Sequence, residues 1–541
     1  APLPSIRGVF VDGDNLNAVL PADAELDFSA YLPAAIAFYL QPGGEVLILE
    51  PKGGLDILAA LELEVEGVQA VESNRLIIQA AQDVYQQPGV TVAAQSGRSY
   101  LACAQNEFDL IHMPLTDSYH PVASGAYALG EDYRYTVEAF SDMIAALKPD
   151  GLLVVTRWLQ ETPSEWLRTF TLSVTALEEA GLKPETQVVA LRGYNTGTLL
   201  IKKCAFDGAE MAAIRRFAGE RAFDLVFGPG LTSDEINRYN ILPEPVYHQA
   251  FTAFVSSESR DEFYRNYPFD VRPPTDQQPF FGHFFKWSQL DEILSTLGVT
   301  WQPFGGAGFL VVIVIFLLAL LLSGVLILLP AALQKKSTLT LKHNKVLPYF
   351  GSIGLAFMFV ELPLIQRFIL YLDQPAYAFA AVLFCILLFS GIGSRYGSRV
   401  MSLSRALLIL VGTLLLYWLA LPSLIQHTLG FPLGARLAIT IGLLSPVGFL
   451  MGIPFPGGLD RTRRGLGDKD SAADQQLVSW MWAVNGASSV LASILASLLA
   501  LSFGFGVTFL LGAGCYLLAW VAEKKLSGWE THTVDGVIGE I

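Results

Sequence analysis

Residues 45–54 read Glu-Val-Leu-Ile-Leu-Glu-Pro-Lys-Gly-Gly, and this stretch governs how the first half of the chain folds. Residues 45–49 form a short, mostly apolar run bounded by glycine and proline, which is typical of a buried parallel strand. Gly53 and Gly54 then open a helical pattern over residues 55–63. A strand that leads through a glycine turn into a helix is the first part of a βαβ unit.

The same alternation continues along the chain. Apolar runs predict further strands at 69–72, 90–94, 108–113 and 151–156, and a helix runs through 143–147. Strands that alternate with helices indicate a doubly wound, Rossmann-like α/β domain with a parallel sheet. We place this domain at residues 1–205. A helical insertion and membrane-junction segment at 206–300 follows it, with helical patterns at 211–220 and 261–265.

The turn after the first strand is where folds of this kind bind a nucleotide. Glycines let the backbone approach the ligand, and the N-terminus of the next helix faces it. Glu72, at the end of the second strand, is placed to accept hydrogen bonds from ribose hydroxyls. The pattern therefore predicts Gly53, Gly54 and Glu72 as cofactor-binding residues. The alternative is a βαβ turn that holds no ligand.

Charge and hydropathy divide the chain of 541 residues into two parts. With 52% hydrophobic and 16% charged residues, it is too apolar for a soluble protein of this size. Residues 1–300 contain 20 lysines and arginines against 40 acidic residues, whereas residues 301–541 contain 15 against 10. The strongly acidic first part disfavours nucleic acid as a partner and weakly favours cationic partners, although the charge also serves solubility.

Seven apolar segments in residues 301–541 are long enough to cross a bilayer. They run roughly over 308–330, 347–371, 376–394, 404–425, 434–456, 476–499 and 503–522. We therefore expect an all-α transmembrane domain of about seven helices, with membrane lipid as its surroundings.

The loops between these segments carry basic residues on one side only. Thirteen lysines and arginines lie there: Lys335, Lys336, Lys342, Lys345, Arg395, Arg399, Arg405, Arg461, Arg463, Arg464, Lys469, Lys524 and Lys525. The opposite short loops contain Arg436 and almost no other basic residue. The positive-inside rule then places the C-terminus in the cytoplasm and residues 1–300 outside it. Because the chain begins with Ala and shows no signal-peptide pattern, we expect a removed N-terminal export segment.

Three polar residues lie inside the apolar segments, where ionisable groups are costly. Glu361 and Arg367 belong to the second segment, and Asn485 to the sixth. They line a polar path for a proton or another cation, or they pair with each other and fix helix packing. We favour packing, because one acidic residue makes a poor relay. The four cysteines form no CxxC motif, so neither a metal site nor a disulfide framework is predicted.

The order of these features resembles the spermidine synthase family, and more closely the bacterial membrane proteins that fuse such a domain to membrane helices. In the first half the resemblance lies in Gly43–Glu72, Gln95–Leu101, Phe108–Ile111, Tyr133–Phe140 and Leu147–Gly151. Further along it lies in Tyr267–Asp270, Pro273–Phe281, Gly452–Pro456 and Trp482–Val490. It covers nearly the whole chain and implies a multi-pass protein of the bacterial inner membrane.

The resemblance implies a spermidine synthase or methyltransferase type of fold, and a site for decarboxylated S-adenosylmethionine or methylthioadenosine. Glu50 and Lys52 stand at glycine positions of the family, and Ser96 and Pro114 stand at acidic ones. The resemblance thus implies a degenerate site, with Ser96 beside Gly53, Gly54 and Glu72 as a cofactor-binding residue. The family's acid at the position of Pro114 takes a proton from the attacking amine. Because an amine must be deprotonated to attack, a carboxylate has to lie within reach, and Asp117 is the remaining candidate base.

Asp12 and Asp14 lie in the opening stretch Val-Asp-Gly-Asp-Asn. They are candidates for binding an amine substrate, although Asp and Gly at this spacing are also typical of a turn.

These departures and the outward topology favour a membrane protein without aminopropyltransferase activity, acting as a scaffold or binding subunit of a membrane complex, with polyamines as candidate ligands. One alternative is an active aminopropyltransferase that makes spermidine from putrescine with Asp117 as its base. Another is a polyamine transporter that uses Glu361 and Asn485.

Overall fold

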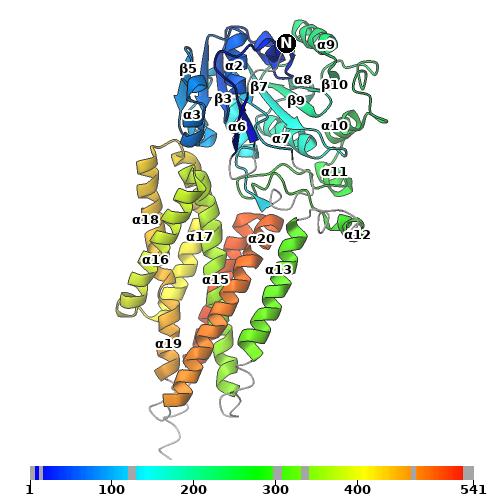
Figure 1. The fold of residues 1–541 in the computed structure, drawn as a ribbon. Helices are drawn as coiled ribbons and strands as arrows, with labels where there is room; N and C mark the ends of the chain where they lie inside the picture. The colour runs from blue at the N-terminus through cyan, green and yellow to red at the C-terminus, as the bar shows by residue number, and fades with distance from the viewer. Residues whose placement is uncertain are drawn as a thin grey trace, which may run out of the picture. The chain divides into compact units, whose positions relative to one another are not determined.

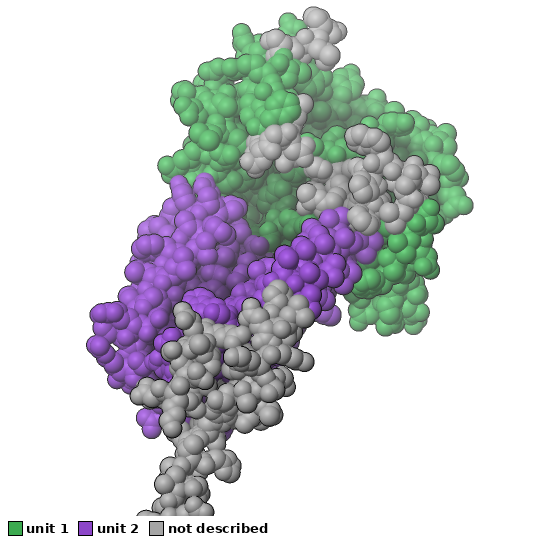
Figure 2. Space-filling view, turned by 60° about the horizontal axis from the view of Figure 1, so that its bottom comes forward, with its two compact units in different colours: residues 1–308 green, residues 309–541 purple. Residues whose placement is uncertain are grey.

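The computed structural model describes residues 6–10, 16–119, 129–295, 308–329, 340–464 and 471–527. The chain divides into two compact units, residues 1–308 and 309–541, which Figure 2 shows in green and purple. The first is called the α/β unit here and the second the helical unit.

The α/β unit is built on an eight-stranded sheet with strand order β10-β8-β9-β7-β6-β3-β4-β5 (Figure 1). Its strands are β3 (Glu45–Leu49), β4 (Gly67–Val71), β5 (Val90–Ala93), β6 (Phe108–Met113), β7 (Leu147–Trp158), β8 (Val188–Arg192), β9 (Thr196–Lys202) and β10 (Asp224–Phe227). Strands β3 to β7 pair in parallel, and β9 pairs antiparallel with both β7 and β8. This confirms the predicted doubly wound fold class, because all five predicted strands are present in the parallel part.

The chain changes direction across the sheet between β3 and β6. From β3 it proceeds through β4 to β5 at one edge, and then returns to add β6 and β7 on the other side of β3. In open α/β sheets, ligands bind at the carboxyl ends of the strands beside such a switch point. A ligand-binding site is therefore expected at the turn after β3 and the loop after β6.

Helices cover both faces of the sheet, and the side chains of β3 show why. Val46 and Ile48 belong to a core with α1 (Ala35–Leu40), α2 (Leu55–Glu62) and α9 (Gly208–Arg221). Leu47 and Leu49 belong to a second core with α6 (Val137–Ala146), α7 (Glu165–Glu179) and α10 (Val246–Ser256). Because successive strand residues point to opposite faces, a strand apolar at nearly every position is buried on both sides.

Short elements complete this unit. They are the hairpin β1 (Arg7–Phe10) and β2 (Leu16–Val19), the 3₁₀ turns η1 (Asp27–Tyr31) and η3 (Trp287–Gln289), and the helices α3 (Arg75–Ala80), α4 (Gln82–Tyr85), α5 (Gly97–Leu101), α8 (Pro184–Gln187), α11 (Arg260–Asn266) and α12 (Leu290–Ser295). The helical patterns predicted at 211–220 and 261–265 correspond to α9 and α11. Beyond residue 206 the chain also returns to the sheet, because β10 pairs with β8.

The helical unit consists of α13 (Gly308–Ser323) with its π-helical end η5 (Gly324–Leu328), α15 (Thr340–Leu372), α16 (Pro375–Val400), α17 (Leu403–Thr428), α18 (Leu433–Met451), α19 (Pro454–Arg464) and α20 (Ser471–Ser527). Among the described residues, six helical segments are long and apolar enough to cross a membrane, rather than the predicted seven. The predicted segments 476–499 and 503–522 are both part of α20.

Gly504 explains this difference. Its φ of 82° and ψ of 170° interrupt α20 in a backbone region that is essentially restricted to glycine. Phe359 of α15 packs against Ala492 and Ala496 before the break, and its backbone lies against Gly512 after it. Because both arms reach the same level of α15, α20 reverses direction at Gly504. The predicted segments 476–499 and 503–522 therefore correspond to the two arms of α20, which are helices on either side of the break and are counted as one continuous span among the six.

Replacing Gly504 should therefore destabilise the helical unit. We expect Gly504→Ala to cost about 1–3 kcal/mol, because alanine cannot adopt this conformation without strain. The matched control is Gly514→Ala in the same element, where an added Cβ meets nothing within 4 Å. Thermal unfolding of the full chain in detergent micelles measures both. Equal midpoints for the two variants would contradict the assignment of the reversal to Gly504.

Candidate functional site

The turn between β3 and α2 has a backbone suited to glycine but contains bulkier residues. Glu50, Lys52 and Gly54 have φ angles of 53°, 49° and 83°, all in the left-handed region. A side chain in this region costs roughly 1–2 kcal/mol, and the cost is absent for glycine. The turn therefore keeps the shape of a glycine-rich, nucleotide-binding loop, although only one of these three positions is glycine.

Gly53 and Gly54 are required by packing inside the protein. A Cβ on Gly53 would lie 2.0 Å from the carbonyl oxygen of Ala18 in β2. A Cβ on Gly54 would lie 2.5 Å from Cγ1 of Val84 in α4. Since real Cβ contacts are never this short, both positions need glycine whether or not a ligand binds, and the glycines alone are no sign of a cofactor.

Lys52 occupies the space between two acidic side chains at the end of the strands. Its Nζ donates to Oε2 of Glu50 at 2.6 Å and to Oε1 of Glu72 at 3.3 Å. The backbone N–H groups of Lys52 and Asn74 also donate to Glu72, at 3.3 and 2.9 Å. Glu72 is 0% exposed. The carboxylate predicted to bind ribose is thus saturated by donors of the protein itself.

The charges of these three groups depend on one another. Burial and the neighbouring Glu50 raise the pKa of Glu72 to about 7, against the opposing effect of Lys52. Burial also penalises ionised Glu50, but Lys52 outweighs this and lowers the pKa of Glu50. Burial likewise opposes the charge on Lys52, and the two glutamates overcome it and raise the lysine's pKa. Glu50 and Lys52 therefore form the ionised pair, and the protonation of Glu72 depends on the charges of both.

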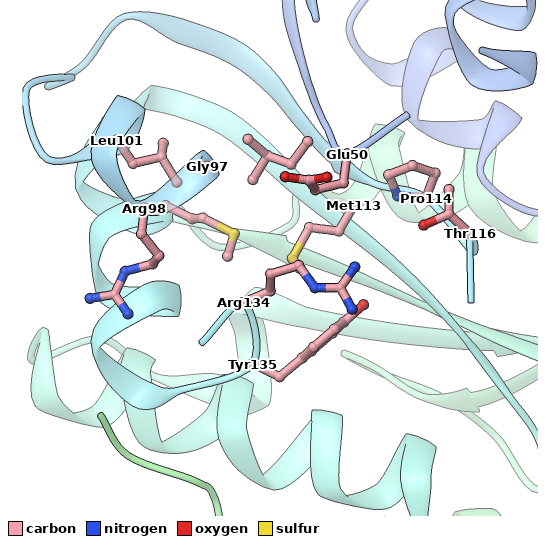
Figure 3. Close-up of a pocket in the computed structure, with 11 residues that line it drawn as sticks. Glu50, Gly97, Arg98, Leu101, Met113, Pro114, Thr116, Arg134 and Tyr135 are labelled. Carbon is pink, nitrogen blue, oxygen red and sulfur yellow. The ribbon is translucent and has the colours of Figure 1, made fainter. Parts of the chain in front are cut away.

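A pocket of about 400 Å³, partly open to solvent, lies next to this network. It is lined by Leu49, Glu50, Gly97, Arg98, Leu101, Met113, Pro114, Thr116, Arg134, Tyr135 and Met143. Figure 3 shows Gly97, Arg98 and Leu101 on one side, and Pro114 and Thr116 on the other. A switch point of the sheet is where folds of this kind bind a ligand, and most of the residues that line this pocket are apolar.

Two of the predicted site residues have structural roles at this pocket. Ser96 is the N-cap of α5, where its hydroxyl accepts a hydrogen bond from the Ser99 N–H at 3.2 Å. Pro114 lines the cavity directly after β6 and brings no proton acceptor to it. Neither residue brings a carboxylate to the pocket.

Asp117 is held by two arginines instead of being available as a base. It accepts hydrogen bonds from Arg157 Nη1 at 2.9 Å and from Arg134 Nη2 at 3.2 Å. Burial raises the pKa of Asp117, but the two guanidinium groups dominate and keep it far below its ordinary range. Such a carboxylate has little tendency to take a proton from an amine. The geometry therefore favours a counter-ion role for Asp117 over the predicted catalytic one.

Arg98, which lines the pocket, forms an ion pair with a residue far away in the sequence, Asp276. Its guanidinium makes two hydrogen bonds to Asp276, at 2.7 and 2.9 Å, and a third to Asp142 at 3.2 Å. Arg98 lies in the segment Gln95–Leu101 and Asp276 in Pro273–Phe281, and neither residue was predicted to belong to the site. A basic residue in one motif and an acid in another is the only signal that could have suggested their pairing.

The other predicted residues lie elsewhere. Asp12 and Asp14 lie outside the described residues. In the helical unit, Asn485 donates to the carbonyl of Phe350 at 3.2 Å, which is a packing role. Across the described ranges no ion pair joins Glu361 to Arg367, and no group of three His, Cys, Asp or Glu side chains is arranged to hold a metal ion.

No protein-family model and no curated protein matches the chain. Solved structures with a similar fold include a spermidine synthase in complex with the transition state analogue AdoDATO, which is 17% identical. That match covers 48% of this chain and 78% of the other, with a TM-score of 0.28. The spermidine synthase from Thermotoga maritima is 16% identical over 48% and 79%, with a TM-score of 0.28. Human methyltransferase-like protein 13 in complex with SAH is 15% identical over 37% and 90%, with a TM-score of 0.25. At this level, the resemblance is one of fold and says nothing about activity.

The counter-ion role of Asp117 predicts a loss of stability in Asp117→Asn. The change takes the shared carboxylate from the buried Arg157 and the partly exposed Arg134, which keep Glu165 and Asp132 as partners. Because two hydrogen bonds to a charged group are lost, we expect it to cost about 2 kcal/mol. The exposed Asp27→Asn is the matched control. Chemical unfolding of the full chain, followed by tryptophan fluorescence, measures the difference, and an unchanged midpoint would contradict the role.

The same group predicts the direction of a pH dependence. Because its pKa is lowered on folding, the stability that Asp117 provides is present above its ordinary value of 3.8 and is lost as the pH falls below it. Asp117→Asn should therefore flatten the acid limb of the stability profile.

Proposed function

We propose that the chain is a membrane-anchored, spermidine synthase-like protein whose α/β unit transfers no aminopropyl group. It serves as a scaffold or binding subunit of a membrane complex. The observation that carries the proposal is the position of Lys52, whose ammonium group lies between the two carboxylates at the nucleotide turn.

The position of Lys52 opposes binding of a nucleoside donor. Ribose hydroxyls would have to reach Glu72, which is fully buried and accepts three hydrogen bonds within the protein. A donor would therefore have to displace the lysine and leave two buried carboxylates without their cation. Breaking a buried pair in this way costs about 3–5 kcal/mol, which weakens binding roughly 150- to 4000-fold.

The proton-transfer step lacks a group to perform it. Pro114 stands where the family has its proton acceptor, and Asp117 is neutralised by Arg134 and Arg157. An amine that stays protonated has no lone pair with which to attack a sulfonium carbon. Donor binding and amine activation are thus weakened by separate changes, as expected of a fold that has lost its reaction.

The helical unit supports a location in the membrane, with six segments able to cross it. The basic loops support a bacterial inner-membrane orientation with the C-terminus in the cytoplasm and the α/β unit outside it. A domain outside the cytoplasm would not meet sulfonium nucleosides made inside. Its acidic charge suits basic surfaces of other subunits, and polyamines as ligands.

The pocket favours a second candidate, an active aminopropyltransferase. The pocket lies directly beside the turn, and Leu49, Leu101 and Met143 offer an apolar surface for a base. This enzyme would have to move Lys52 and use Asp117 as its base.

Calorimetry with methylthioadenosine on the full chain in detergent tests the proposal. We expect no binding to the wild type at millimolar ligand. Lys52→Ala should expose Glu72 and give measurable binding, because the competing ammonium group is gone. The control is Lys148→Ala, since Lys148 pairs with Asp109 at the opposite ends of the strands.

Two results would contradict the proposal. One is micromolar binding by the wild type, and the other is release of methylthioadenosine from decarboxylated S-adenosylmethionine and putrescine. The scaffold role makes a separate prediction. Cross-linking in native membranes should yield a defined complex that contains the chain. A monodisperse monomer in mild detergent, with no cross-linked species, would argue against it.

A further inference from the structure

Glu361 lies near the middle of the Val346–Leu372 membrane span of α15. This span is 67% buried, the highest share among the six candidate spans in the described residues. Glu361 itself is 6% exposed. A carboxyl group at this depth is surrounded by protein and hydrocarbon, where an uncompensated negative charge is strongly disfavoured.

No cation in the described part of the chain compensates this carboxyl group. Among the described residues, no lysine, arginine or histidine forms an ion pair with it, and the arginines of α18 and α19 that form ion pairs do so with other acids. Arg436 pairs with Asp373 at 2.6 Å, and Arg461 pairs with Glu523 at 2.9 Å.

Arg367 is also too far from Glu361 to compensate its charge. It lies six residues further along α15, which corresponds to about 9 Å along the helix axis. The predicted mutual pairing of Glu361 and Arg367 therefore does not account for the buried acid.

Both arms of α20 pack against α15 at the level of Glu361. Phe359, two residues before it, packs against Ala492 and Ala496 of the first arm. From the second arm, Cys515 joins this cluster, and the fully buried Tyr516 interacts electrostatically with the Glu361 carboxyl group. These two are the titratable side chains that α20 contributes here, and neither carries a positive charge.

Size and chemistry restrict what can bind. A side chain so deeply buried leaves no room for an organic ammonium ion, and a single carboxylate does not make a site for a metal ion. A proton needs no cavity and removes the charge. Pro363 stands two residues further on and deprives the same turn of one backbone hydrogen bond, which weakens the helix beside the carboxyl group.

We infer that Glu361 is an intramembrane proton-binding site. The carboxyl group holds its proton while α15 is packed between the arms of α20, and it releases the proton when water or a cation reaches it. This function is independent of the α/β unit and of its lost chemistry.

Infrared spectroscopy of the full chain in lipid nanodiscs at neutral pH tests the inference. The wild type should show the C=O band of a protonated carboxyl group, shifted in D₂O, and this component should be lost in Glu361→Gln. Glu523→Gln, which removes an acid paired with an arginine, should leave it unchanged. Identical carboxyl bands in the wild type and Glu361→Gln would overturn the inference.

Chemical labelling of the wild-type protein tests the same inference and needs no variant. Dicyclohexylcarbodiimide reacts with protonated carboxyl groups in apolar surroundings, so mass spectrometry of the treated wild type should locate the adduct on Glu361. Labelling should decrease at alkaline pH. Absence of an adduct on Glu361 from mildly acidic to mildly alkaline pH would overturn the inference even if Glu361→Gln failed to fold.

Discussion

The ion pairs of Lys52 with Glu50 and Glu72 are the interaction on which the character of the α/β unit depends. They lie where the sheet reverses its strand order, the position at which this architecture usually opens to a ligand. Two buried carboxylates this close repel each other unless a cation stands between them. Because the cation is a side chain of the same turn, the site is complete without any bound molecule.

The need of buried charges for a partner of opposite charge also explains the other ion pairs of the α/β unit. Asp117 is shared by two arginines, and Arg98 is bonded to Asp276 and Asp142. Each of these pairs joins segments that lie far apart in the sequence, so the charges also hold loops to the sheet. Glu361 in the helical unit is the contrasting case, since it is as deeply buried but has no partner of opposite charge among the described residues. A proton is what such a group requires.

Local sequence patterns predicted a large part of the architecture. The parallel strands from 45 to 156 could be placed because strands buried on both faces are nearly continuous apolar runs. The membrane segments could be placed because hydrocarbon tolerates so few polar residues. The antiparallel strands β8, β9 and β10 were missed, because short apolar runs among helices do not show with which strand they pair.

The candidate site shows where such patterns stop being informative. Sequence alone was sufficient to place Glu50, Lys52 and Glu72 at the carboxyl ends of two parallel strands, since the βαβ periodicity positions them along the chain. It could not show that Lys52 points inward and saturates Glu72, because the orientation of a side chain depends on burial by residues distant in sequence. The separation of the last two membrane segments was predicted from their lengths, but the residue at which the chain turns, Gly504 with a φ of 82°, is visible only in the fold. Helices, strands and membrane spans follow from local periodicity, whereas charge pairing and the backbone conformation of a turn depend on contacts that exist only in the folded molecule.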